Sequence, residues 1–270
     1  YHKSIGFDKI LIITNDLTDG SDSLLSALHK KGEIIWVDVS HVPIVNGSIG
    51  KRAYRYAFEH PEVINSEWVI DLDIDEFIVL KLHDNVNDFI SSYLDADSVI
   101  VNWRVFGSNG QLRKDEGKVI ERFKTSLPKK HVSRRQIKSF SRVSRLKNLS
   151  AHFSGFKSGP VKVYHSTGNL AFKCPLEDSF DKAYRKPVTE VDYSVSQINH
   201  YIVKSLDEFV FRTFRGDATH DGHSFRYNFS YFMKSNRFEE KNEDILIFSD
   251  VVEERIKFWV DELSLYTFIE

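Results

Sequence analysis

In the first eighty residues, apolar runs typical of strands alternate with segments whose apolar residues have helical spacing. The runs at 9–16, 33–39 and 68–74 are rich in β-branched residues and have the composition of strands. The segments 21–32 and 48–61 carry apolar residues at helical spacing, and Gly32 and Pro61 end them. This order of strands and helices predicts right-handed crossovers and a mostly parallel sheet flanked by helices.

The pattern changes after residue 83. Segment 84–94 predicts a helix capped by Asp84, and 98–106, 118–123, 136–143 and 161–165 predict short strands. The last third predicts helices: a capping box from Ser205 to Glu208 opens one, and 249–268 is amphipathic. We therefore expect an α/β domain at 1–203 and a helical C-terminal extension at 204–270 packed on it.

Carboxylates interrupt the apolar run WVIDLDIDEFIVL at 68–80. In an extended chain Asp71, Asp73 and Asp75 would share one side, and the apolar residues between them would pack on the other. Neighbouring carboxylates repel one another and resist desolvation, so this group needs a cation or water. In such sheets ligands bind beyond the carboxyl ends of strands, where Asn15 and Asp16 follow the first strand. We expect both polar groups to meet at one edge.

Composition and charge narrow the class of protein. The 270 residues are 41% hydrophobic and 28% charged, as in globular enzymes, and no run approaches 18 apolar residues. The single cysteine, Cys174, favours a reducing compartment, so we expect a cytoplasmic protein. The net charge of −2 hides a segment, 122–176, with 13 Lys or Arg and no acid. This basic segment is either a solvated face balanced by the fold, or a site for phosphate, pyrophosphate or anionic lipid at a membrane surface.

Carboxylates two residues apart suit Mg²⁺ or Mn²⁺, which bind through one or two carboxylates plus substrate phosphates. The run NDLTDGSDSLL, followed some fifty residues later by WVIDLDIDEFI, resembles the GT-A glycosyltransferases, and specifically a family-2-like group with an Asp-x-Asp-Glu-Phe metal motif. NWRVFGSNG at 102–110, VIERF at 119–123 and INHYIVKSLDEFVFRTFRG at 198–216 are similar to further blocks of that group. The first strand that is usual in the group is absent here, so either it lies upstream of Tyr1 or the nucleotide base is held differently.

The resemblance implies a role for individual residues. Asp73 and Asp75 would bind the metal and the donor diphosphate, with His200 as a further ligand and His152 and His165 as weaker alternatives. The nucleotide and its phosphates would contact Asn15, Asp16, Asp19, Lys51 and Lys204. Trp103, Phe106, Gly107 and Ser108 would hold the acceptor sugar, although ordinary core packing explains the aromatic residues equally well.

The implied reaction moves a hexose from a nucleotide sugar, with UDP as the expected nucleotide, to a glycan or lipid-linked glycan acceptor. An inverting enzyme needs one carboxylate base for the acceptor hydroxyl. Asp178 is the first candidate and Glu121 the second, while a helix cap explains Asp178 as well.

Two other classes of protein remain open. A phosphohydrolase of the haloacid dehalogenase type needs Thr or Val two residues after its second Asp, where this chain has Asp75 or Phe77. A non-catalytic sugar- or nucleic-acid-binding module could use the basic segment, but no recognised nucleic-acid motif occurs, so we expect no nucleic-acid partner.

Overall fold

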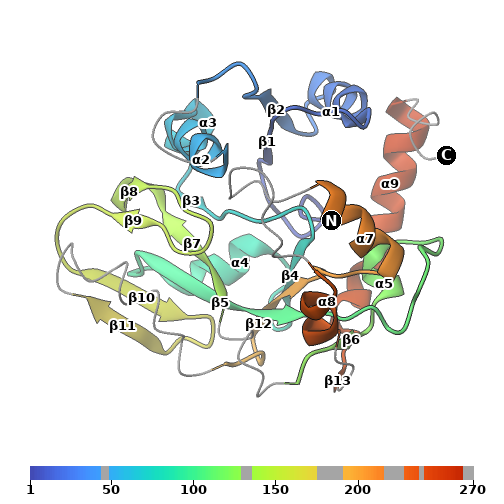
Figure 1. Ribbon diagram of the computed structural model, residues 1–270. Coiled ribbons are helices and arrows are strands. Elements are labelled where there is room, and N and C mark those ends of the chain that lie inside the picture. Colours follow the sequence, from blue (N-terminus) through green and yellow to red (C-terminus); the bar gives the residue numbers. More distant parts are fainter. Residues whose placement is uncertain (44–48, 129–135, 175–190, 216–227, 237–239, 264–270) are drawn as a thin grey trace.

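The computed structural model describes residues 1–43, 49–128, 136–174, 191–215, 228–236 and 240–263 (Figure 1). Within them, the main sheet has seven strands around β5 (Ser98–Val105), all of whose residues are buried. The first half of β5 pairs with β10 (Val161–His165) and β7 (Ile137–Arg142), and the second half with β12 (Ser196–His200). The sheet is completed by β11 (Leu170–Cys174) beside β10, β4 (Glu76–Leu80) beside β12, and β3 (Trp68–Val69) beside β7.

The prediction of a mostly parallel sheet is wrong. Strands β10 and β12 run parallel to β5, but β7, β4 and β11 are antiparallel to their neighbours. The first three predicted strands also do not share one sheet. Strands β1 (Leu11–Thr14) and β2 (Ile35–Asp38) form a parallel pair of their own, whereas β3 joins the main sheet. Apolar runs identify strands, but they do not identify the partner of each strand.

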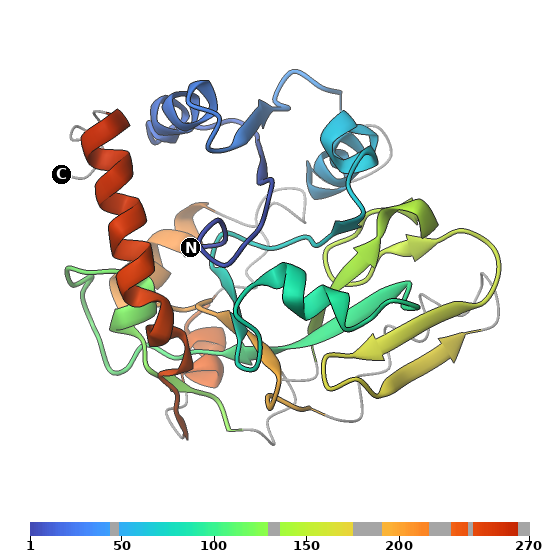
Figure 2. The ribbon, with the colours of Figure 1, turned by 180° about the vertical axis from the view of Figure 1, so that it is seen from behind.

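Helices lie beside both the β1–β2 pair and the main sheet (Figures 1 and 2). Near the small sheet lie α1 (Ser21–Lys30), α2 (Ile49–Glu59) and α3 (Pro61–Ile64). Helix α4 (Val86–Ser91) buries Phe89 in the main core, and its cap is Asn85 rather than the predicted Asp84. The side chain of Asn85 accepts a hydrogen bond from the backbone N–H of Asp88.

The predicted strand at 118–123 is instead a helical turn, α5 (Val119–Arg122). Ile120 and Phe123 are both buried, and their spacing of three residues is what a helix needs to place two side chains on one face. The alternation of a strand would have exposed one of them. The prediction failed because a run this short does not distinguish the two periods.

Helices α7 (Leu206–Arg215), α8 (Phe229–Ser235) and α9 (Ser249–Leu263) follow the last strand of the main sheet. Helix α9 lies beside α5 (Figure 2), where Lys118 Nζ is 2.5 Å from Glu253 Oε2. Trp259 of α9 packs against the small core of Leu28 and Ile34. The division at residue 203 stays a prediction. None of the described helices is long and apolar enough to cross a membrane.

The remaining short elements are β6 (Thr125–Ser126), η2 (Val143–Arg145), β8 (Leu146–Asn148), β9 (Gly155–Phe156), β13 (Glu240–Lys241) and η3 (Asp244–Phe248).

Candidate metal centre

A tight turn, and not a strand, carries the acidic motif. Strand β3 ends at Val69, and the backbone N–H of Glu76 donates to the carbonyl of Asp73 at 2.9 Å. Ile74, at the tip of the turn, is 92% exposed, although strand alternation predicted it in the core. Strand β4 starts at Glu76, directly after the turn. Asp71, Asp73 and Asp75 therefore do not lie along one side of a single strand, as the sequence predicted.

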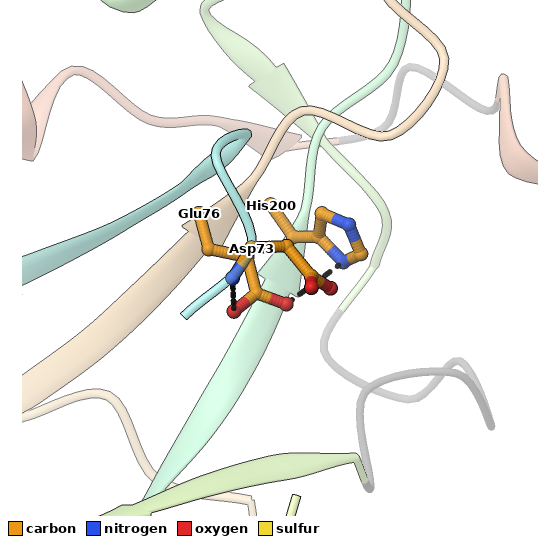
Figure 3. Close-up of side chains that lie close together, drawn as sticks. All are labelled: Asp73, Glu76 and His200. Atoms are coloured by element: carbon orange, nitrogen blue, oxygen red, sulfur yellow. Dashed lines mark hydrogen bonds and ion pairs between the residues drawn. The ribbon is translucent and has the colours of Figure 1, made fainter. Parts of the chain in front are cut away.

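Glu76 and His200 are direct partners across the antiparallel register of β4 and β12. Opposed residues in such a pair project from the same face of the sheet. The Nδ1 atom of His200 is 3.9 Å from Oε1 of Glu76. Asp73 completes the group: one ligand atom from each of the three residues lies within 4.8 Å of the others. Figure 3 shows the two carboxyl groups and the imidazole ring converging.

Two buried atoms in this group have no hydrogen-bond partner in the described part of the chain: Glu76 Oε1 and His200 Nδ1. An unsatisfied buried polar atom is costly. Ligand atoms about 2.0–2.2 Å from one ion lie up to roughly 4 Å apart, which matches their separation. Two carboxylates and a neutral imidazole are suitable ligands for a divalent cation, so these residues fit a metal.

Asp75 points to a different set of partners. Its Oδ2 is 3.0 Å from Nη1 of Arg212 on α7, and its Oδ1 is 3.5 Å from Nε2 of His200. Burial would raise the pKa of Asp75, but the hydrogen bond from His200 and the charges of Arg212 and Lys204 outweigh it and lower that pKa strongly. Asp75 therefore orients the His200 ring from the side opposite Glu76.

Lys138, in the middle of β7, brings a buried ammonium to the group and is only 1% exposed. Its Nζ is 3.2 Å from Asp71 Oδ2, 3.2 Å from Glu76 Oε2 and 3.8 Å from Asp73 Oδ2. The hydroxyl of Tyr54 donates to Asp71 at 3.4 Å. The charges of the carboxylates raise the pKa of Lys138 although burial acts to lower it, so the side chain is an ammonium.

Negative charge exceeds positive charge in this cluster. Four carboxyl groups, those of Asp71, Asp73, Asp75 and Glu76, contact two side-chain cations, Lys138 and Arg212. Burial raises the pKa of Glu76 to about 9, with the charges of Asp73 and Asp75 acting in the same direction and Lys138 against them. With Glu76 protonated, one negative charge is in excess; a bound divalent cation would displace that proton and balance the two excess negative charges of the four carboxylates.

The ring of Trp103 packs beside the group and contacts two histidine rings. Its ring centroid lies 4.2 Å from that of His200 and 5.0 Å from that of His152. Nε1 of Trp103 is buried and has no hydrogen-bond partner among the described residues. Nδ1 of His152 lies 3.0 Å from the carbonyl oxygen of Ile137, and burial together with Lys138 lowers the pKa of His152 to about 4. His152 is therefore neutral at neutral pH.

Comparison with known proteins identifies the family of this chain. The sequence profile described as Glycosyltransferase family 92 matches residues 1–245. The chain belongs to glycosyltransferase family 92. A search of curated proteins found no significant match. The crystal structure of HddC from Yersinia pseudotuberculosis is similar at 16% identity over 68% of this chain and 80% of that chain, with a TM-score of 0.32, too low to carry an argument.

The match shows that this family 92 protein is a glycosyltransferase, as the sequence motifs indicated. The matched family is family 92, whereas the sequence motifs resembled a family-2-like group.

Of the predicted acceptor residues in this glycosyltransferase, only Trp103 lies beside the metal group. Phe106 is fully buried and its ring packs 4.7 Å from that of Tyr201 in the core. The backbone N–H of Gly107 donates to Thr125, and that of Ser108 donates to the side chain of Asn236. Core packing therefore explains Phe106.

The predicted nucleotide residues lie on separate elements. Asn15 and Asp16 follow β1, where the backbone N–H of Asp16 is 2.7 Å from Ser40 Oγ, and Asp19 accepts from the backbone N–H of Ser21. Lys51 is exposed on α2. Lys204, by contrast, has a left-handed backbone at φ 54° and its charge acts on Asp75. The structure brings together Asp73, Asp75 and His200, and the charge of Lys204 acts on Asp75.

Of the two predicted bases, only Glu121 lies in the described part of the chain, and it is not part of this group. Asp178 lies outside the described residues. Glu121 is on α5, where it accepts a hydrogen bond from Ser249 and pairs with Lys118 at 3.0 Å. His165, a weaker predicted ligand, is bound instead to Asn102 Oδ1 at 2.5 Å.

The basic segment is largely balanced by acids from elsewhere in the fold. Four of its residues, Lys129, Lys130, Arg134 and Arg135, lie outside the described part of the chain. Among the described residues, ion pairs join Arg122 to Glu208, Lys124 to Glu243, Arg142 to Glu67, Arg145 to Asp97 and Lys162 to Asp95. These pairs support the interpretation of a face balanced by the fold.

Sequence reasoning missed Lys138, Arg212 and the place of Glu76 in this group. Lys138 was hidden in the charge run, although its alternation with Phe140 along β7 placed both on the inner face. Glu76 was overlooked because a strand, rather than a turn, was expected at Asp73.

Proposed function

We propose that this protein transfers a hexose from a nucleotide sugar, with a UDP-sugar as the first donor to test, to a hydroxyl of a glycan or lipid-linked glycan. In this proposal the GT-A assignment is kept, and the divalent cation is held by Asp73, Glu76 and His200. The observation that carries it is the pair of unsatisfied buried atoms, Glu76 Oε1 and His200 Nδ1, beside an exposed Asp73.

The ligand atoms favour Mn²⁺ over Mg²⁺, because Mg²⁺ prefers an all-oxygen shell whereas this site offers an imidazole nitrogen. The bound ion would neutralise charge on the departing nucleoside diphosphate. Asp75 holds the ring of His200, and Lys204 and Arg212 add positive charge next to Asp75. Trp103 would contact the sugar with its ring and its indole N–H.

The acceptor hydroxyl must lose a proton, and we propose Asp178 as the base of an inverting reaction. Glu121 is the weaker choice because Lys118 and Ser249 already engage its carboxylate. Asp178→Asn should remove transfer and leave donor binding intact.

The direct experiment is a screen of nucleotide sugars for Mn²⁺-dependent donor hydrolysis and transfer. Activity should disappear with a chelator and return with added Mn²⁺. Asp73→Asn should abolish this response, whereas Asp84→Asn, an exposed acid outside the cluster, should not. Full turnover in a chelator would refute the metal role.

A further inference from the structure

Lys138 reaches the cluster from a strand that carries no predicted ligand. It pairs in register with Val101 of β5, so its side chain projects from the same face as that residue. The ammonium is enclosed by Asp71, Asp73 and Glu76. Tyr54 of α2 donates to Asp71, so the partners of Lys138 are themselves held.

The two carboxyl oxygens of Glu76 have different surroundings. Oε2 lies 3.2 Å from the ammonium and accepts from the backbone N–H of Asp73 at 3.2 Å. Oε1 is left without a partner, 3.9 Å from His200 Nδ1. One end is thus fixed, and the other faces the proposed ion.

We propose that Lys138 is a positioning residue that holds Glu76 with Oε1 directed at the cation. This inference rests on the proposed function. An ammonium has donors and no acceptor, so Lys138 itself cannot be a ligand. It acts through Glu76 and through the backbone of the turn at Asp73.

Charge and geometry predict opposite effects when Lys138 is removed. A positive charge this close repels Mn²⁺, so by electrostatics alone Lys138→Met would bind Mn²⁺ more tightly. If the ammonium positions Glu76, its loss weakens binding, as loss of a ligand's outer partner does, by about 10- to 100-fold. The direction of the change therefore separates the two roles.

The test measures Mn²⁺ binding by the electron paramagnetic resonance signal of the free ion, without sugar or nucleotide. We expect a Kd about 10- to 100-fold higher in Lys138→Met, and a smaller rise in Lys138→Gln, which keeps a neutral hydrogen-bond donor at this position. Lys157→Met is the matched control, because that exposed lysine donates to the carbonyl of Ser144, outside the cluster, and its Kd should equal that of the unsubstituted protein.

Thermal unfolding without metal checks that each variant is folded, and Lys138→Gln decides the matter by the same titration if the Met variant is not. An unchanged or lower Kd in the folded variant overturns the inference and leaves the proposed function standing. Failure of the unsubstituted protein to bind Mn²⁺ overturns the metal-dependent function and this inference with it.

Discussion

Glu76 opens β4 directly opposite His200, the last residue of β12, and their ligand atoms lie 3.9 Å apart with no hydrogen bond between them. Two neighbouring strands of the main sheet therefore fix two of the three proposed ligands. Asp73 comes from the turn that immediately precedes β4. The site is held by backbone pairing, which limits how far its ligands can separate.

His200→Gln should lower Mn²⁺-dependent transfer by about 100-fold or more, because it removes a group that holds charge at the reaction centre. The measurement is kcat/KM at saturating Mn²⁺. His83→Gln is the control, since His83 contacts Ser92 and Phe89, away from the cluster. Equal rates in both variants would contradict the ligand role of His200.

Asp73→Asn and Asp75→Asn should differ in kind. The first should weaken Mn²⁺ binding with little effect on folding, because the side chain of Asp73 is 55% exposed. The second should also lower the free energy of unfolding, by about 3 kcal/mol, because it leaves Arg212 without its buried carboxylate. Calorimetric Mn²⁺ titration and urea unfolding of both variants measure the two effects, and identical profiles would count against this division.

Phe106→Ala should destabilise the protein by about 3–5 kcal/mol, because it opens a cavity beside Tyr201 in the core. The folded fraction should retain the KM for the acceptor. Urea unfolding and initial rates at low temperature check the two expectations. A raised acceptor KM in a stable variant would restore Phe106 to the acceptor site.

Acid stability should depend on Glu208, whose carboxylate lies 2.5 Å from buried Arg122. Burial acts to raise its pKa, but hydrogen bonds from Arg122 and Ser205 outweigh burial and lower it below 4.5. The pair therefore stabilises the protein above pH 4.5, and this contribution disappears as pH falls through the lowered pKa.

Glu208→Gln should cost about 2 kcal/mol near neutral pH, and the cost should shrink in acid as the native carboxylate takes up a proton. The comparison is Tm against pH for the two proteins. A difference in Tm that stays constant from pH 7 to pH 3 would contradict the assignment.

Strands with a strong local pattern were predictable from the sequence. The run 98–106 became β5 and the run 161–165 became β10, because every second position in a buried strand is apolar or small. The sequence did not predict that Glu76, rather than Asp75, groups with Asp73 and His200. This arrangement depends on the turn, which a hydrogen bond from the backbone N–H of Glu76 to the carbonyl of Asp73 closes.

The sequence also did not predict which charged side chains contact one another. Lys138 is 62 positions from Glu76, and the successive pairing of β7 with β5, β5 with β12 and β12 with β4 brings them together. His200 was found through a motif, whereas Arg212, twelve residues later, carries no signal of its own before α7 is placed. Local pattern predicts elements, and long-range pairing decides which side chains meet.

The most direct measurement is anomalous X-ray scattering from crystals soaked in Mn²⁺. One strong peak should lie within about 2.3 Å of a carboxylate oxygen of Asp73, Oε1 of Glu76 and Nδ1 of His200. Crystals at saturating Mn²⁺ that show no peak at these three atoms, or a peak bound only by other residues, would contradict the account.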